Sequence, residues 1–419
     1  APDLAPGRPA ADLAAPLLHP DLLDCTDHDH DGVSACAGDC DDEDQAVHPL
    51  AAELCNARDD DCDGRVDEGW EEDGDGWSVC AGDCDDHDPH AHPGGRPLCN
   101  GRDNNCNGRI DTVEDLDGDG TAACQDCDDG DPNVNPGAME VGGDHIDNNC
   151  DGRIDEAPAP CDLNLPFRPQ DAADQAAALD LCPGPFLVAA AFLARADARA
   201  VAVDPDYGAY LPRAGRNLAV LSTGIAADEN DPDYVPPQDG TSFYTNAPNP
   251  LPMGMNCGGQ DPMLVYDYTE LALTIKVPTN ARSLSFDFNF LSAEYPEWVC
   301  KAFNDKFLAV LDSKAFKGNI SFDAKGHPVT VNNGFFTVTA PADLAGTGYE
   351  SWDTKVAGPA GAATGWLTTT TPVAPGELLT LRFIVFDEGD HILDSAVLLD
   401  HLHFNLTPAQ NGPETMRSM

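Results

Sequence analysis

The C-terminal half of the chain contains runs in which apolar and polar residues alternate. In the segment 284–291, Leu284, Phe286, Phe288 and Phe290 occupy every second position, with small or polar residues between them. Because successive side chains of a strand point to opposite faces, this pattern predicts a strand with one buried and one solvated face. Similar runs predict strands at 271–277, 307–311, 329–331, 366–370, 378–386 and 396–404. Together they predict an antiparallel, jelly-roll-like β-sandwich of two sheets.

A short helix is expected to precede these strands. Residues 170–182 are rich in alanine, and Asp171 stands where an N-cap residue would be. Upstream, Pro158 and Pro160 mark a change from acidic, cysteine-rich sequence to alanine-rich sequence. We therefore expect a linker at 157–169, the sandwich domain at 170–407 and a C-terminal tail at 408–419.

The N-terminal half has no clear apolar period and repeats itself instead. Arg65, Arg109 and Arg153 superpose with a step of 44 residues, each within a Gly-Arg-Val/Ile-Asp element. Residues 24–156 therefore form three tandem copies. Residues 1–23, rich in Ala, Pro and Leu, are expected to be an arm or linker.

Each repeat opens with an Asp-x-Asp-x-Asp-Gly element or a close variant and closes with a second acidic loop. Calcium takes about six to eight oxygen ligands at roughly 2.3 to 2.6 Å, and glycine permits the sharp turn that points carboxylates inward. The closing loop matches the first nine positions of an EF-hand loop, but Trp70 and Pro158 replace the twelfth-position Glu in two copies. We therefore expect the central aspartates of each repeat to supply further oxygens, with about two calcium ions per repeat.

The predicted calcium ligands form three groups that recur in every repeat. The opening loops contribute Asp27, Asp29, Asp31, Glu71, Asp73, Asp75, Asp115, Asp117 and Asp119. The central elements contribute Asp39, Asp41, Asp42, Asp44, Asp83, Asp85, Asp86, Asp88, Asp126, Asp128, Asp129 and Asp131. The closing loops contribute Asp59, Asp61, Asp63, Asp67, Asp103, Asn105, Asn107, Asp111, Asp147, Asn149, Asp151 and Asp155. One acidic turn alone would indicate solvated surface, but loops in fixed register favour cation sites, so metal is expected to act as a folding ligand.

The charge balance supports cation binding and excludes other partners. The formal net charge is -52, from 74 acidic and 22 basic residues, and no lysine precedes Lys276. Such a field repels phosphate, which excludes nucleic acid and anionic membranes as partners. No run of about 18 apolar residues occurs, so we expect no membrane span.

Cysteine indicates an oxidising compartment. Of 16 cysteines, 12 precede residue 160, in sequence too poor in large apolar side chains to form a core. Disulfides are therefore expected, and with them a secreted or cell-surface location, which a chain starting at Ala1 without Met also suggests. The repeat pattern pairs Cys40–Cys62, Cys84–Cys106, Cys127–Cys150, Cys36–Cys55 and Cys80–Cys99, followed by Cys161–Cys182 and Cys257–Cys300. Cys25 and Cys124 stay unassigned. Zinc ligation is the alternative, because Cys36-x-x-x-Cys40 and Cys124-x-x-Cys127 have similar spacing.

Histidines near the loops raise a second alternative, copper or zinc. They are His28, His30, His87, His90 and His92. They do not recur in the third repeat, so surface residues or an incidental second site are expected.

The repeats resemble the MopE-type metal-binding repeat of secreted bacterial proteins. The resemblance lies in the run Gly-Asp-Cys-Asp-Asp, then His/Asn-Pro, then Asp-Asn-Asn-Cys-Asp-Gly-Arg-Ile-Asp-Glu. In their expected use of acidic residues to bind cations, they are also similar to thrombospondin type 3 repeats. Downstream, the segments 218–224, 286–297, 303–307 and 394–400 resemble the choice-of-anchor L domain. Myxobacteria carry many such proteins. The resemblance implies an exported surface or matrix protein with a β-sandwich. That repeat family is often labelled copper-binding, which the oxygen ligands here do not support.

A further site is predicted in loops of the sandwich. Asp387, Asp390 and Asp394 lie between two predicted strands, and Glu294, Asn304 and Asp305 lie in another loop. Loops at one end of a sandwich could converge on another calcium ion. Ordinary polar turns are the alternative.

The sequence features bear on three function classes. The first is a structural or adhesive surface protein whose calcium-loaded arm is a stiff spacer or contacts further copies, as in a filament. The second is a calcium-dependent carbohydrate-binding module, with Tyr295, Trp298, Trp352 and Trp366 as candidate glycan contacts. The third, a hydrolase, is disfavoured because neither Gly-x-Ser-x-Gly nor His-Glu-x-x-His occurs. We therefore expect no enzymatic activity.

Overall fold

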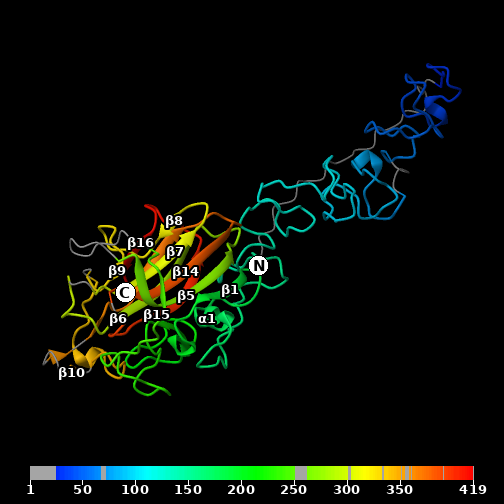
Figure 1. Ribbon diagram of the computed structural model, residues 1–419. Helices are drawn as coiled ribbons and strands as arrows, with labels where there is room; N and C mark the ends of the chain where they lie inside the picture. Colours follow the sequence, from blue (N-terminus) through cyan, green and yellow to red (C-terminus); the bar gives the residue numbers. More distant parts are fainter. Residues whose placement is uncertain are drawn as a thin grey trace. The chain divides into compact units, whose positions relative to one another are not determined.

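The computed structural model describes residues 25–67, 72–250, 262–300, 303–332, 335–350, 352–353, 358–359, 361–389 and 391–418. Glu71, Asp390 and the expected arm at 1–23 lie outside these residues. The chain forms two compact units. One comprises Ala1–Glu114 with Ala122–Cys124, and the other comprises Asp115–Thr121 with Gln125–Met419. The second unit therefore contains most of the third repeat together with the sandwich (Figure 1).

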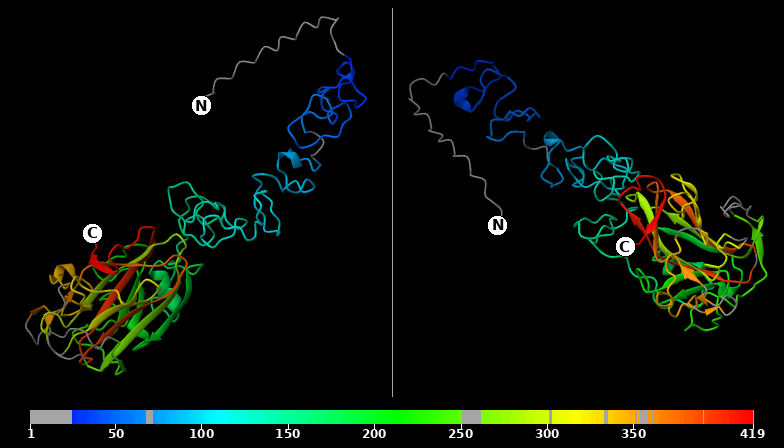
Figure 2. Two further views of the ribbon diagram at one scale, coloured as in Figure 1. Left: turned by 90° about the horizontal axis from the view of Figure 1, so that it is seen from above. Right: turned by 90° about the vertical axis from the view of Figure 1, so that its left-hand side faces the viewer.

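The sandwich consists of two antiparallel sheets, whose strands are coloured green to red in Figures 1 and 2. The first sheet has the order β1-β5-β14-β7-β8, with β4 on β5 and β9 on β7. Its strands are β1 (Leu187–Ala194), β4 (Asn246–Pro248), β5 (Leu264–Lys276), β7 (Lys306–Asp312), β8 (Lys317–Asn319), β9 (Val329–Thr330) and β14 (Leu378–Asp387).

The second sheet has the order β16-β13-β6-β15-β3-β2, with β12 on β6. Its strands are β2 (Val201–Asp204), β3 (Leu218–Ser222), β6 (Ser283–Ser292), β12 (Ala362–Ala363), β13 (Leu367–Pro372), β15 (Ser395–Asn405) and β16 (Glu414–Arg417). A separate pair joins β10 (Trp352–Asp353) to β11 (Gly358–Pro359). The predicted mainly β fold with a two-sheet sandwich is therefore confirmed.

Helices are few and short among the described residues. The α-helix α1 (Ala172–Ala178) begins after Asp171, whose carboxylate accepts a hydrogen bond from the Ala173 N–H at 3.0 Å, as the predicted N-cap would. The 3-10 helices are η1 (Ala35–Ala37), η2 (Val79–Ala81), η3 (Ala198–Ala200) and η4 (Pro341–Asp343).

The alternating phenylalanines of β6 form the centre of the core between the sheets. The ring of Phe286 packs edge-on against Phe383 of β14 at 4.9 Å, and the ring of Phe288 lies 4.8 Å from Phe307 of β7. All four side chains are fully buried. Aromatic side chains bury large apolar areas, so these contacts join one sheet to the other.

The expectation of a solvated second face on β6 is wrong. Ser285, Asp287 and Asn289, on the polar face, are also buried. The Thr368 hydroxyl donates to Asp287 at 2.5 Å, and the Thr364 hydroxyl donates to Asn289 at 3.2 Å. Polar side chains of neighbouring segments thus satisfy this face and cover it, which the alternation of β6 alone does not reveal.

All seven predicted strands are present, with boundaries shifted by one or two residues except for β5, which begins at Leu264 and not at Leu271. The segment 408–419, expected to be a tail, contains β16, which pairs with β13 from Thr370↔Glu414 to Leu367↔Arg417. The sequence does not predict β1 and β12, because half of β1 is alanine and β12 is a pair of alanines, which do not signal a strand.

The third repeat is hydrogen-bonded to the sandwich within the second unit. The Thr279 N–H donates to the Gly137 carbonyl at 3.0 Å, and the Thr279 hydroxyl donates to Asn135 at 2.7 Å. The Asn280 amide accepts from the Met139 N–H at 3.0 Å and donates to the Met139 carbonyl at 2.8 Å. Because Asn135 and Asn280 are buried, these bonds fix this repeat on the loop between β5 and β6.

The repeats contain six disulfides, and their pattern corrects two predicted pairs. The pairs Cys40–Cys62, Cys84–Cys106, Cys127–Cys150 and Cys161–Cys182 are confirmed. The predictions Cys36–Cys55 and Cys80–Cys99 are wrong, because the observed pairs are Cys25–Cys36, Cys55–Cys80 and Cys99–Cys124. Two of these connect one repeat to the next. A cysteine at Gly143 would have no following repeat to reach, which is the sequence signal for this pattern. Of the predicted Cys257–Cys300 pair, Cys257 lies outside the described residues.

The buried carboxyl group of Asp204, in the sandwich, predicts a dependence of stability on pH. Burial, and then the adjacent Asp231, raises the pKa of Asp204 from 3.8 to about 9. In the unfolded chain Asp204 loses its proton near 3.8, whereas the folded chain keeps it until about pH 9, so this group's contribution to stability declines as pH rises through that window. We expect Asp204→Asn to remove this decline and to raise the free energy of unfolding at pH 8 by about 1 to 2 kcal/mol. Thermal unfolding of the wild type and the variant at pH 5 and pH 8 measures this effect. A variant whose free energy of unfolding differs from that of the wild type by the same amount at both pH values would contradict the prediction.

Candidate metal centres

The opening loop of each repeat is folded by its own carboxylates. In the first repeat, Asp27 accepts hydrogen bonds from the N–H groups of His30 at 2.7 Å and Gly32 at 3.0 Å. Asp29 and Asp31 each accept from the N–H two residues further on, at 3.1 and 2.6 Å. The same pattern recurs at Asp75, Asp115, Asp117 and Asp119. Asp27 and Asp115 thus use both oxygens on the backbone, whereas Asp29, Asp31, Asp117 and Asp119 each use one.

The first aspartate of the central element joins this loop. One oxygen of Asp39 accepts the Asp41 N–H at 2.9 Å, and the other oxygen is shielded from solvent without a hydrogen-bond partner. Oxygens in the same condition recur in all three repeats, on Asp29, Asp31, Asp39, Asp75, Asp83, Asp117, Asp119 and Asp126. A shielded carboxylate oxygen without a donor is costly, so its recurrence at equivalent positions indicates a cation-binding role.

The spacing of these oxygens fits a calcium ion. One oxygen each of Asp27, Asp29 and Asp31 lie within 4.8 Å of one another, as do oxygens of Asp73, Asp75 and Asp83. Two ligands on opposite sides of an ion, each at roughly 2.3 to 2.6 Å, are about 4.6 to 5.2 Å apart. The carboxylates therefore already stand at ligand separation.

Electrostatics show the cost of holding these groups together without a cation. Burial raises the pKa of Asp126 from 3.8 to about 6, with further contributions from the charges of Asp119, Asp117 and Asp129. Burial also raises the pKa of Asp117, and the neighbouring Asp119 and Asp115 add to it. A divalent cation would reverse this unfavourable interaction.

The third aspartate of each central element ties the element to the opening loop. Asp42 accepts from the His28 N–H at 3.5 Å, Asp86 from the Glu72 N–H at 3.2 Å and Asp129 from the Leu116 N–H at 3.1 Å. The opening loop and central element thus act as one site in each repeat.

Other central aspartates have arginine partners in the first two repeats. Arg58 donates to Asp41 at 2.7 Å and to Asp44 at 2.8 Å. Arg102 donates to Asp85 at 2.9 Å and to Asp88 at 3.1 Å. In the third repeat, Asp128 and Asp131 accept from the backbone N–H groups of Gly130 and Asn133 instead. The structure therefore does not direct these residues toward the closing loops, where they were expected.

The closing loops gather a different set of acidic groups. Asp59, Asp61 and Asp63 accept backbone N–H groups within their own loop, as do the equivalents Asp103, Asn105, Asn107, Asp147, Asn149 and Asp151. In the first repeat an oxygen of Glu53 lies within 4.8 Å of oxygens of Asp59 and Asp61. Glu53 was missed in the sequence because it precedes the loop by six residues and matches no loop position.

Each later closing loop receives an acid from its C-terminal side. The buried Glu114, at the twelfth loop position, accepts from the Asn107 amide at 2.6 Å, and Glu156 accepts from the Asn149 amide at 3.2 Å. The ninth-position aspartates fasten the loop to preceding backbone instead. Asp67 accepts the Asn56 N–H, Asp111 the Leu98 N–H and Asp155 the Gly143 N–H.

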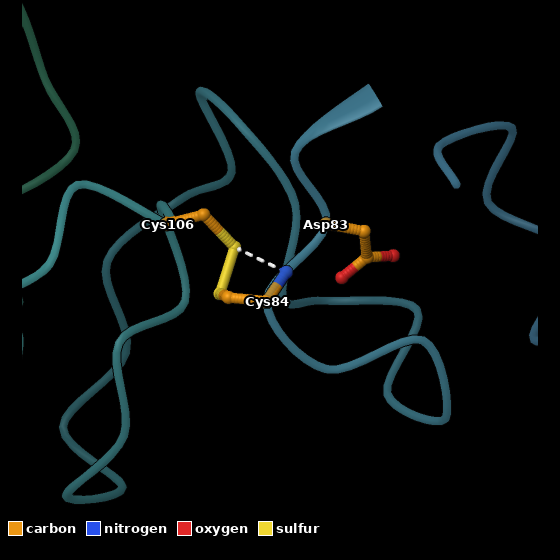
Figure 3. Close-up of side chains that lie close together, drawn as sticks. All are labelled: Asp83, Cys84 and Cys106. Carbon is orange, nitrogen blue, oxygen red and sulfur yellow. Dashed lines mark hydrogen bonds between the residues drawn. A yellow bond between two sulfur atoms is a disulfide. The ribbon is translucent and has the colours of Figure 1, made fainter. Parts of the chain in front are cut away.

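The cysteines are not zinc ligands in the described part of the chain. Sulfur atoms of Cys84 and Cys106 lie beside Asp83 as a thiolate site would require, but they form a disulfide. Figure 3 shows the Asp83 carboxylate pointing away from the two sulfur atoms. This disulfide joins the residue after Asp83 to the middle of the closing loop, so it links the two candidate metal centres of the repeat.

The histidines contribute no ligand to the acidic clusters described above. His28 binds Asp42 at 2.8 Å, His87 binds Glu72 at 3.1 Å, and the ring of His92 stacks on Trp77. All-oxygen clusters suit calcium better than copper, which favours imidazole and other nitrogen ligands.

The candidate glycan contacts are largely used in packing. Tyr295 stacks on Phe336 at 5.3 Å, Trp298 contacts Phe303 at 4.9 Å, and Trp366 contacts Tyr210 at 6.4 Å. The side chain of Trp352 lies outside the described residues. Among the residues with known positions, no helix is both long and apolar enough to cross a bilayer.

The predicted sandwich residues meet at one end of the fold. Asp387 ends β14, Asp394 and Asp305 immediately precede β15 and β7, and Glu294 follows β6 by two residues. Asp305, Asp387 and Asp394 are each at most 3% exposed.

Family comparisons agree with this architecture. Residues 39–68, 83–112 and 126–156 each match the family Cu-binding_MopE, described as "Putative metal-binding motif". Residues 219–405 match the "Choice-of-anchor L domain" family. Both predicted resemblances are therefore confirmed. Comparison with curated proteins and with solved structures gave no match.

Proposed function

We propose, from the combination of three MopE-type metal-binding motifs with a choice-of-anchor L domain in one disulfide-rich chain, that this is a secreted, calcium-binding structural or adhesive protein of a cell surface. Calcium would hold the repeats in a defined shape, and the loaded repeats would act as a spacer or as a contact for further copies. The protein would have no enzymatic activity.

The observation that carries this proposal is the set of shielded, donor-free carboxylate oxygens at equivalent positions of all three repeats. Oxygen ligands in this number favour a hard cation, and oxygens within 4.8 Å of one another suit calcium. Copper would need nitrogen or sulfur donors, whereas the sulfurs here are oxidised and the clusters contain carboxylates.

Two neighbouring substitutions test the calcium sites. Asp83→Asn neutralises a carboxylate with a donor-free oxygen, so we expect it to remove one bound calcium ion per chain. Asp85→Asn, two residues further on, removes a carboxylate that binds Arg102, so the calcium count should not change. Equilibrium dialysis with metal analysis measures both. Equal calcium counts in wild type and Asp83→Asn, or a preference for copper over calcium, would contradict the proposal.

A further inference from the structure

A second group of acidic side chains lies inside the sandwich, apart from the repeats. Asp387 at the end of β14 is 2% exposed, and neither of its carboxylate oxygens has a hydrogen-bond partner. The Thr223 hydroxyl lies beside it, but that hydroxyl donates its proton to the Ser395 carbonyl at 3.4 Å. A fully buried carboxylate with two unsatisfied oxygens requires a proton or a cation.

The groups around Asp387 increase its need for a cation. The charges of Asp305 and Asp394 add to burial in raising its pKa well above the usual range. Asp305 accepts from the Ser395 hydroxyl at 2.6 Å, and Asp394 accepts from the Thr241 N–H at 2.9 Å, so both side chains are held in place. Their carboxylates retain lone pairs for a further ligand.

Two other acidic groups nearby have donors of their own. The buried Lys306 ammonium binds both carboxylate oxygens of Glu388, at 2.8 and 2.9 Å. Burial raises the pKa of Asp267, the nearby His391 acts against this rise, and Asp267 accepts the Phe243 and Thr245 N–H groups at 3.2 Å each. These contacts account for Glu388 and Asp267, while Asp305, Asp387 and Asp394 together have the composition of an oxygen-ligand cation site.

Gly224, two residues after β3, leaves room for this arrangement. A β-carbon at this position would lie 1.8 Å from one oxygen of Asp394 and 2.7 Å from the other. Any side chain here would displace the Asp394 carboxylate.

We propose that Asp305, Asp387 and Asp394 bind a buried calcium ion that joins the two sheets at this end of the sandwich. Asp387 ends β14 and Asp305 directly precedes β7 of one sheet, whereas Asp394 directly precedes β15 of the other. The ligands are too buried for a sugar hydroxyl to reach the ion, so the site is structural and does not bind glycans.

The test uses the full chain and counts bound calcium by metal analysis after dialysis. Asp387→Asn, which keeps the size of the side chain, should lose one calcium ion and lower the melting temperature of the sandwich by about 5 to 10 °C in calcium. In EDTA the same variant should melt at or above the wild-type temperature, because it no longer carries the unpaired charge.

A second variant and two controls keep the result specific. Gly224→Ala removes no carboxylate from the sequence but displaces that of Asp394, so this variant should lose the same ion. Asp312→Asn, at the other end of β7 and 67% exposed, should keep the full count. Asp83→Asn reports on the repeats alone, so failure of either proposal is recognised separately. A proton in place of the ion would overturn this proposal: Asp387→Asn would then keep every calcium ion and melt higher in both calcium and EDTA.

Discussion

Removal of divalent cations with EDTA should open the acidic repeats while the sandwich strands stay folded. Each site that binds calcium only in the folded state contributes about 4 kcal/mol when free calcium is 1,000-fold above its dissociation constant. Withdrawal leaves the carboxylates of the opening loops facing one another without a counter-ion. We expect new protease cleavage within 25–156, a larger radius of gyration by small-angle scattering, and loss of any self-association seen by sizing.

Adding calcium or magnesium back after EDTA treatment tests whether the repeats require calcium in particular. Calcium should restore protease resistance, whereas magnesium should do so poorly, because it requires a smaller octahedral site and keeps its water. The fragment that starts near residue 157 should persist in EDTA, although its melting temperature should fall if the buried sandwich site is occupied. Repeats that resist protease equally with and without calcium would refute a folding role for the metal.

The second large effect concerns the disulfide Cys84–Cys106. It closes a 22-residue separation, so replacing both cysteines by serine should lower the free energy of unfolding by about 3 kcal/mol through chain entropy. The bond also joins the residue next to Asp83 to the closing loop, so calcium affinity of the second repeat should fall as well. Calcium titration of the oxidised variant measures this effect.

The disulfide Cys161–Cys182 provides the control. Its separation of 21 residues predicts nearly the same entropic loss, but it lies outside the repeats. Replacing it should lower stability by a similar amount and leave calcium affinity unchanged. If both double variants bind calcium like the wild type, the Cys84–Cys106 bond has no role in shaping the metal centres.

The sequence was sufficient wherever neighbouring residues determine the structure. Alternation over 284–291 predicted β6, and an alanine-rich segment after Asp171 predicted α1, because strand and helix periods and capping are local properties. The 44-residue step identified three repeats, and it predicted one disulfide in each repeat correctly because those cysteines recur at equivalent positions. The Asp-x-Asp-x-Asp-Gly spacing likewise located the opening loops, since alternate carboxylates accept the N–H groups of their own turn.

The tertiary structure decided which distant groups meet. Cys55 joins Cys80 of the next repeat, Arg58 binds Asp41 and Asp44, and Glu53 reaches the closing loop, although none of these pairs follows from spacing within a repeat. The polar face of β6 is buried by neighbouring segments, and Asp305, Asp387 and Asp394 lie at the ends of three strands that belong to two sheets. Such contacts depend on how strands pair and loops fold back, whereas a local pattern specifies only the periodicity of its own segment and cannot specify what packs against it.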